Sequence, residues 1–178
     1  MTLDLAGIRL LASDVDGVLT PGTILLDAEG KRLALFSARD GMGVTLALHA
    51  GLEVALVSGA DAPAVRARAA ELGIRHLCAG VSDKGAALAQ LCVRTGVEPA
   101  AVLFLGDDLN DLPAFRAVGV RVAVADAAPE LRAHADWVTC HRGGAGAFRE
   151  VVDAVLRAQG RYAATVTSLF GVTPGPGG

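Results

Sequence analysis

The sequence is poor in aromatic residues and in cysteine. Phe, Trp and Tyr together make up 4% of its 178 residues, although hydrophobic residues make up 52%. A buried core must therefore consist mainly of Ala, Val and Leu side chains. The three cysteines, Cys78, Cys92 and Cys140, include no C-x-x-C pair. This number and spacing argue against a disulfide framework or a structural zinc site and favour a reducing environment.

No part of the chain is strongly basic or continuously apolar. The net charge is −3 without any block of basic residues, whereas DNA binding normally leaves a cationic stripe. No uncharged apolar run approaches the roughly 20 residues that a membrane span needs. The N-terminus lacks the basic and apolar regions of a signal peptide. We therefore expect a cytoplasmic protein of one domain that binds neither nucleic acid nor membrane.

Short apolar runs alternate with segments of helical length along most of the chain. The apolar runs lie at residues 8–13, 52–57, 75–78, 101–105 and 120–124. The helical segments lie at residues 41–50, 63–72, 84–95, 111–118, 129–133 and 145–159. Runs that are apolar on both faces are typical of a parallel sheet covered by helices. The alternation predicts an α/β fold with a doubly wound parallel sheet.

Residues 22–37 interrupt this alternation. Two strand-like segments, Thr23–Asp27 and Lys31–Ser37, flank a turn at Ala28–Gly30, which predicts a β-hairpin directly after the first strand's acidic loop. We expect residues 1–160 to form a single domain. Residues 161–178, which end in Thr-Pro-Gly-Pro-Gly-Gly, are predicted to be a mobile tail.

Polar residues stand at the ends of three predicted strands. Asp14, Ser58 and Asp107 each follow an apolar run, and Lys84 begins the helix after another strand. Because parallel strands end at one edge of the sheet, where ligands bind, we expect these residues to converge. Each motif alone is weak, since acidic pairs, Ser-Gly turns and helix-initiating residues are usually structural. Their common edge favours a site for phosphoryl transfer.

The acidic residues suit metal-assisted attack on phosphorus. Asp14 can bind Mg²⁺, because hard cations prefer oxygen ligands, and can attack phosphorus to form an aspartyl-phosphate. Asp16 is placed to protonate the departing alkoxide and later to deprotonate the hydrolytic water. Asp107 would complete the metal site.

The remaining polar groups would bind the phosphoryl oxygens and offset their negative charge. Ser58 and nearby backbone N–H groups can hold the phosphoryl oxygens, and Lys84 can offset the charge that builds on them. Asp108 and Asp111 would anchor metal-bound water or orient Lys84. The predicted catalytic set is therefore Asp14, Asp16, Ser58 and Lys84.

These motifs resemble those of a known superfamily. Asp14–Thr20, Val57–Gly59, Lys84 and Gly106–Asp111 look like the four motifs of the haloacid dehalogenase (HAD) superfamily. More narrowly, the chain resembles the capless 3-deoxy-D-manno-octulosonate 8-phosphate (Kdo-8-phosphate) phosphatases over nearly its whole length. The resemblance implies a Rossmann-like HAD fold with a β-hairpin flap and no cap domain.

The resemblance also implies a metal site and an assembly. Mg²⁺ would be bound by Asp14, Asp107 and the backbone carbonyl of Asp16. The protein would be a homotetramer in which hairpins form a barrel and a neighbouring subunit walls each active site. The segments after the first and third strands are too short for a cap domain, so a neighbouring chain could exclude water instead.

Substrate contacts are implied by the same resemblance. They comprise Asp16, Ser37, Ala38, Arg39, Asp40, Gly41, Ser58, Gly59, Arg68 and Lys84. However, Ala60, Thr45 and Ala145 stand where the family often has basic residues, which removes partners for a carboxylate. The expected substrate is Kdo-8-phosphate, and a nonulosonate 9-phosphate or a broader range of sugar phosphates is the alternative.

Two other classes of protein are compatible with part of this pattern. A receiver domain also uses an Asp phospho-acceptor, Mg²⁺, a hydroxyl and a Lys, but its acceptor follows an acidic pair and lies on a later, central strand. Here the Asp-x-Asp pair is on the first strand, and Asp16 supplies an acid/base that a phospho-switch does not need. The third class is a non-catalytic oligomerisation module, which the complete acidic set disfavours.

Overall fold

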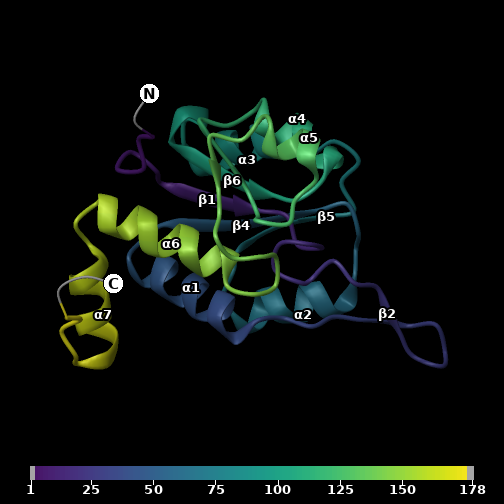
Figure 1. The fold of residues 1–178 in the computed structure, drawn as a ribbon, viewed down its shortest axis with the longest axis horizontal. Helices are drawn as coiled ribbons and strands as arrows, with labels where there is room; N and C mark the ends of the chain where they lie inside the picture. The colour runs from purple at the N-terminus through teal and green to yellow at the C-terminus, as the bar shows by residue number, and fades with distance from the viewer. Residues whose placement is uncertain (1–2, 176–178) are drawn as a thin grey trace.

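A six-stranded parallel sheet forms the centre of the molecule (Figure 1). The computed structural model describes residues 3–175. The strands stand in the order β5-β4-β1-β6-β7-β8. They are β1 (Leu10–Ser13), β4 (Glu53–Ser58), β5 (His76–Ala79), β6 (Val102–Gly106), β7 (Val120–Ala123) and β8 (Trp137–Val138). The chain moves outward from β1 to β5 and then returns to β6 beside β1, which is the reversal point where α/β sheets bind ligands.

Helices cover both faces of the sheet, as the doubly wound prediction requires (Figure 1). One face carries α1 (Ala38–His49), α2 (Pro63–Glu71), α6 (Ala147–Ala158) and α7 (Tyr162–Phe170). The other carries α3 (Lys84–Thr95), α4 (Leu112–Phe115) and α5 (Pro129–Arg132). Short 3₁₀ turns lie at Pro99–Ala101 and Leu109–Asp111. Within residues 3–175, no helix has the length and apolar character needed to cross a membrane.

The predicted hairpin is present but its strands are short. Strand β2 (Leu25–Leu26) pairs with β3 (Arg32–Leu33) in antiparallel register, and the pair projects away from the body of the molecule (Figure 1). Five apolar side chains of this region are exposed, with exposed fractions between 43% and 65%: Ile24, Leu25, Leu26, Leu33 and Leu35. An apolar surface on a projecting hairpin is typical of a contact with another chain.

The prediction of a mobile tail from residue 161 is wrong for its first part. Residues 162–170 form α7, because this stretch contains no Gly or Pro and turns apolar residues toward the body of the protein. Tyr162, Val166 and Leu169 pack against the core, and the guanidinium of Arg157 lies 4.0 Å from the centre of the Tyr162 ring. Residues 176–178, the last part of the predicted tail, lie outside the described residues.

Candidate active site

One buried ammonium group bridges two buried carboxylates at the end of β1. The backbone N–H of Asp14 donates to the carbonyl of Leu105 on β6, at 3.0 Å, which holds the start of the acidic loop beside that strand. Nζ of Lys84 lies 2.8 Å from Oδ1 of Asp14 and 2.7 Å from Oδ1 of Asp111. Lys84 is 3% exposed and Asp111 is fully buried. The arrangement keeps a positive charge directly beside the predicted nucleophile.

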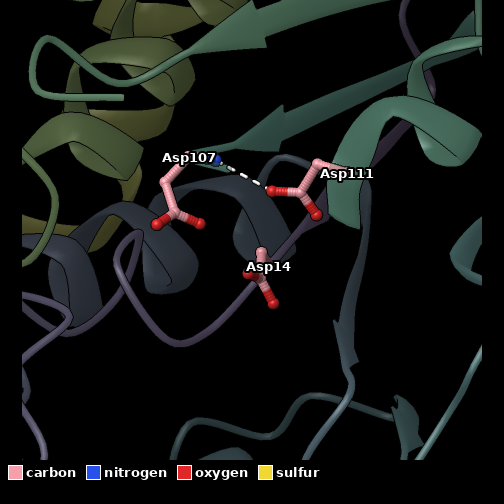
Figure 2. A group of neighbouring side chains, drawn as sticks. All are labelled: Asp14, Asp107 and Asp111. Atoms are coloured by element: carbon pink, nitrogen blue, oxygen red, sulfur yellow. Dashed lines mark hydrogen bonds between the residues drawn. The ribbon is translucent and has the colours of Figure 1, made fainter. Parts of the chain in front are cut away.

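Asp111 also shapes the loop after β6. Its Oδ2 accepts a hydrogen bond from the backbone N–H of Asp107 at 2.8 Å, as Figure 2 shows. Asp108 caps the short turn that follows, accepting from the N–H of Leu109 at 2.7 Å. Both oxygens of Asp111 are thus engaged, one by Lys84 and one by the loop. The side chain is placed to orient Lys84 and Asp107 together.

A glycine lets the two acidic loops meet. Gly17 has φ +88°, and a Cβ atom there would lie 2.0 Å from Oδ2 of Asp107. Any other residue would therefore push the Asp107 carboxylate away from the loop that carries Asp14 and Asp16. The glycine of the Asp-Val-Asp-Gly motif is explained by this close approach.

The carboxylates form a site that fits a hard divalent cation. One oxygen each from Asp14, Asp107 and Asp111 lie within 4.8 Å of one another (Figure 2). Burial, reinforced by Asp111 and opposed by Lys84, raises the pKa of Asp14 from 3.8 to about 6. Burial, with the charges of Asp14 and Asp111, raises the pKa of Asp107 to about 8. Such crowding of acidic oxygens is what a Mg²⁺ ion would relieve.

Asp14 and Asp107 border a cavity of about 590 Å³ at the carboxyl edge of the sheet. It is lined by Asp14, Asp16, Gly22, Gly59, Ala60, Asp107, Asp108, Leu109 and Asn110. The side chain of Asp16 is exposed there, while Ser58 is 1% exposed and its Oγ accepts from the N–H of Ala60 at 3.1 Å. Three of these lining residues, Gly22, Leu109 and Asn110, are not among the predicted site residues, although the last two stand between the acidic residues of the Gly106–Asp111 motif.

Within one chain, the structure does not bring the segment at residues 37–41 to this cavity. The Oγ of Ser37 caps α1 instead, accepting from the N–H groups of Arg39 and Asp40 at 3.2 and 3.4 Å. The Asp40 carboxylate is buried and accepts from the N–H groups of Gly146 and Arg149, both at 3.1 Å. Asp40 therefore joins α1 to the start of α6.

Arg68 is likewise turned toward this segment. Its guanidinium donates to Glu71 at 2.9 Å and, more weakly, to the carbonyl of Ser37 at 3.5 Å. Gly41 lacks the side chain that would collide with it, since a Cβ atom at residue 41 would lie 2.3 Å from Nη2 of Arg68. The substrate contacts expected of Arg68, Asp40 and their neighbours are thus absent from this chain's own cavity and stay predictions.

Comparisons with known proteins agree with this fold. A profile of haloacid dehalogenase-like hydrolases matches residues 71–147. The 3-deoxy-D-manno-octulosonate 8-phosphate phosphatase of Escherichia coli K12 is 47% identical over 154 residues, which cover 86% of this chain and 82% of the relative. The enzyme of that name from Yersinia pestis is similar in structure, with a TM-score of 0.87 and 43% identity. The alignment covers 89% of this chain and 86% of the Yersinia chain.

A third comparison concerns a structure with ligands. The 3-deoxy-D-manno-octulosonate 8-phosphate phosphatase of Moraxella catarrhalis, solved with magnesium ion, phosphate ion and KDO, has a TM-score of 0.90 and 36% identity. The alignment covers 93% of this chain and 95% of that one. The fold and the acidic site place the chain in the class of haloacid dehalogenase-like hydrolases. Within that class it belongs to the family of 3-deoxy-D-manno-octulosonate 8-phosphate phosphatases.

Proposed function

We propose that this chain is a Mg²⁺-dependent phosphatase that hydrolyses Kdo-8-phosphate through an aspartyl-phosphate on Asp14. The observation that carries the proposal is the position of the Asp14 carboxylate. One oxygen is held by Lys84, and the side chain borders a cavity that Asp16 and Asp107 share. The substrate is taken from the three relatives, all of which are named for this activity and one of which was solved with magnesium, phosphate and KDO.

The first half-reaction needs a nucleophile and an acid on the same cavity. The free oxygen of Asp14 attacks phosphorus, the bond between phosphorus and the sugar oxygen breaks, and Asp16 donates a proton to that oxygen. In the second half-reaction Asp16 takes a proton from water, which attacks the phosphorus of the aspartyl-phosphate and regenerates Asp14. Backbone N–H groups near Gly59, beside the buried Ser58, are placed to hold phosphoryl oxygens.

Two positive charges assist this chemistry. Lys84 offsets the charge of Asp14, so the carboxylate can stay ionised in spite of its burial. When Mg²⁺ is bound, with Asp14, Asp107 and the carbonyl of Asp16 as its protein ligands, it supplies charge that stabilises the phosphoryl oxygens during transfer.

The same proposal includes a homotetramer that works in the cytoplasm. The exposed apolar side chains of the hairpin support an assembly through this element. A subunit seated there would narrow a cavity that no cap domain covers. The cytoplasm suits the three cysteines, all of which are free thiols.

The test is a phosphate-release assay on Kdo-8-phosphate, a nonulosonate 9-phosphate and a panel of hexose phosphates, with and without Mg²⁺. We expect the highest kcat/KM for Kdo-8-phosphate, dependence on Mg²⁺, and a loss of at least about 10³-fold in Asp14→Asn. Asp4→Asn, at an exposed carboxylate of the N-terminal turn, is the control and should retain activity. Turnover by Asp14→Asn would exclude the assigned nucleophile. A stable phosphoprotein without turnover would point to a receiver-like function instead.

A further inference from the structure

The cavity offers no positive charge to the carboxylate of the proposed substrate. Kdo-8-phosphate carries a phosphate at one end and a carboxylate at the other. All charged side chains that line the cavity are acidic, and the lining position next to the Ser-Gly motif is Ala60. Among the described residues, the cation nearest the nucleophile is Lys84, which is buried and already paired with Asp14 and Asp111. A second anionic group therefore needs a cation from outside this lining.

We propose that Arg142 is this cation and determines the preference for sugar-acid phosphates; the inference rests on the function proposed above. Arg142 begins the loop at residues 142–146, which packs directly on the nucleophile loop. The N–H of Gly144 donates to the carbonyl of Val18 at 2.8 Å. A Cβ atom on Gly143 would lie 1.7 Å from the carbonyl oxygen of Gly17, so the two loops touch through their backbones.

Asp126 holds Nε of Arg142 and the backbone of the next residue, between the loop after β1 and the loop after β6. Its Oδ2 accepts from Nε of Arg142 and its Oδ1 from the N–H of Gly143, both at 3.0 Å. Two residues later, the N–H of Ala128 donates to the carbonyl of Asp107 at 2.8 Å. Arg142 is thus tied on one side to the loop of Asp107 and on the other to the loop that follows Asp14.

The two terminal nitrogens of the Arg142 guanidinium are available to a ligand. Its side chain is 75% exposed, and only Nε is engaged in an ion pair or hydrogen bond with the described residues. The two terminal nitrogens are left to form a bidentate pair with a carboxylate, the geometry that arginine supplies best. Asp126 holds the plane of the group, so less side-chain freedom is lost on binding.

Two other basic residues that the sequence predicts at the substrate are less suited. Arg68 is committed to Glu71 and Ser37. Arg39 lies in a separate groove along α6 with His141, Arg149, Glu150 and Asp153. Arg142 also stands in the same loop as Ala145, so it restores a positive charge to a loop whose Gly-Gly-x-Gly segment contains none.

The experiment compares Arg142→Gln and Arg142→Lys with wild type on a carboxylated and an uncarboxylated substrate. We expect Arg142→Gln to raise KM for Kdo-8-phosphate by about 10- to 100-fold, the usual effect of losing a charge-assisted bidentate pair. The rates on a hexose 6-phosphate and on p-nitrophenyl phosphate should stay within about twofold. In Arg142→Lys, KM for Kdo-8-phosphate should lie between the values of wild type and Arg142→Gln. Lysine keeps the positive charge but cannot form two parallel N–H bonds to a carboxylate.

Arg121→Gln is the matched control. Arg121 also donates through Nε to an aspartate, Asp136, at 2.9 Å, but it lies near the amino end of β7, away from the cavity. An unchanged KM for Kdo-8-phosphate in Arg142→Gln, or an equal loss on every substrate, would overturn the inference while leaving the proposed function intact. Failure of the wild type on every sugar-acid phosphate would overturn the proposed function itself and this inference with it. If the wild type prefers the nine-carbon acid, the comparison is made with that substrate.

Discussion

Lys84 and Asp14 form an ion pair of 2.8 Å that is almost completely closed to solvent, with side-chain exposures of 3% and 5%. Burial lowers the pKa of Lys84, but attraction to Asp14 and Asp111 outweighs this and raises it above its ordinary value. The ammonium is therefore charged throughout the neutral range. The pKa of its partner Asp14 is raised to about 6, mainly by burial, and this lysine is the group that opposes the rise most strongly.

Replacing Lys84 by Met is expected to damage both activity and stability. Without the ammonium, the buried carboxylates of Asp14 and Asp111 repel each other, and Asp14 is protonated over a wider pH range. We expect kcat to fall by about 10³-fold and the free energy of unfolding to fall by about 3–5 kcal/mol, as is typical when one partner of a buried pair is removed. Urea unfolding and phosphate release measure the two effects. Arg94→Met, at an exposed residue in the last turn of α3, should show neither.

Mg²⁺ should stabilise the protein more at high pH than at low pH. The folded-state pKa values of Asp14 and Asp107, about 6 and about 8, exceed the ordinary value of 3.8. The folded state therefore binds more protons than the unfolded state across this range, and these groups favour folding at low pH but lose that contribution as pH rises through 6 and then 8. Mg²⁺ competes with the same protons, so its affinity rises with pH.

Thermal unfolding with Mg²⁺ or EDTA on either side of this range checks the prediction. The increase in Tm on adding Mg²⁺ should be larger above pH 8 than below pH 6. Asp107→Asn removes one of the two titrating groups and one predicted Mg²⁺ ligand. It should therefore reduce both the Mg²⁺-dependent increase in Tm and the dependence of that increase on pH. Equal shifts at the two pH values would show that the carboxylates do not bind the ion.

The sequence could predict the sheet and the meeting of its acidic residues for one physical reason. Apolar runs identify buried strands, and the carboxyl ends of parallel strands share an edge, so Asp14 and Asp107 had to lie close. Strand β8 is not predicted because Trp137 and Val138 stand between polar residues, Asp136 and Thr139, and form no apolar run. Helix α7 is not predicted because the Gly- and Pro-rich residues at the end of the chain indicate a mobile tail after residue 160.

Side-chain directions were harder to predict than positions. Asp40 lies on α1, and whether its carboxylate faces the cavity or the body depends on α6, about a hundred residues later. No local pattern contains that information, because it arises from the packing of two helices. The exact partners of Arg68 depend in the same way on the absence of a side chain at Gly41.

Asp40→Ala distinguishes a structural role from the substrate contact that the family resemblance implies. The buried carboxylate accepts two backbone N–H groups at the start of α6, so its loss should lower the free energy of unfolding by about 1–3 kcal/mol. KM for Kdo-8-phosphate should change by less than about twofold, because Asp40 does not line this chain's cavity. A large rise in KM with unchanged stability would instead support direct contact with the sugar acid. The same measurements on Asp61→Ala, an exposed aspartate paired with Arg66, provide the baseline.

Gly143→Ala should disturb the nucleophile loop. A Cβ atom at this position would lie 1.7 Å from the carbonyl oxygen of Gly17, so the backbone of one loop must shift. Overpacking of this kind costs about 1–3 kcal/mol, and we expect kcat to fall at least about tenfold because Asp16 and Gly17 move together. Gly7→Ala is the control, since its nearest contact would be an ordinary 3.4 Å to Asp4. Full activity of Gly143→Ala would mean that the two loops can separate without consequence.

Leu26→Asp tests whether the exposed hairpin holds subunits together. Leu26 is 56% exposed on β2, and a charge at that position would be buried without a partner in an apolar interface. Light scattering should then show a smaller species than wild type, and kcat/KM for Kdo-8-phosphate should fall because no neighbouring chain narrows the cavity. Val93→Asp places the same charge on α3 at a side chain that is 85% exposed, and it should leave both the mass and the activity unchanged. A Leu26→Asp protein of unchanged mass would rule out assembly through the hairpin, and the wall that shields the aspartyl-phosphate from bulk water would have to come from another surface of the chain.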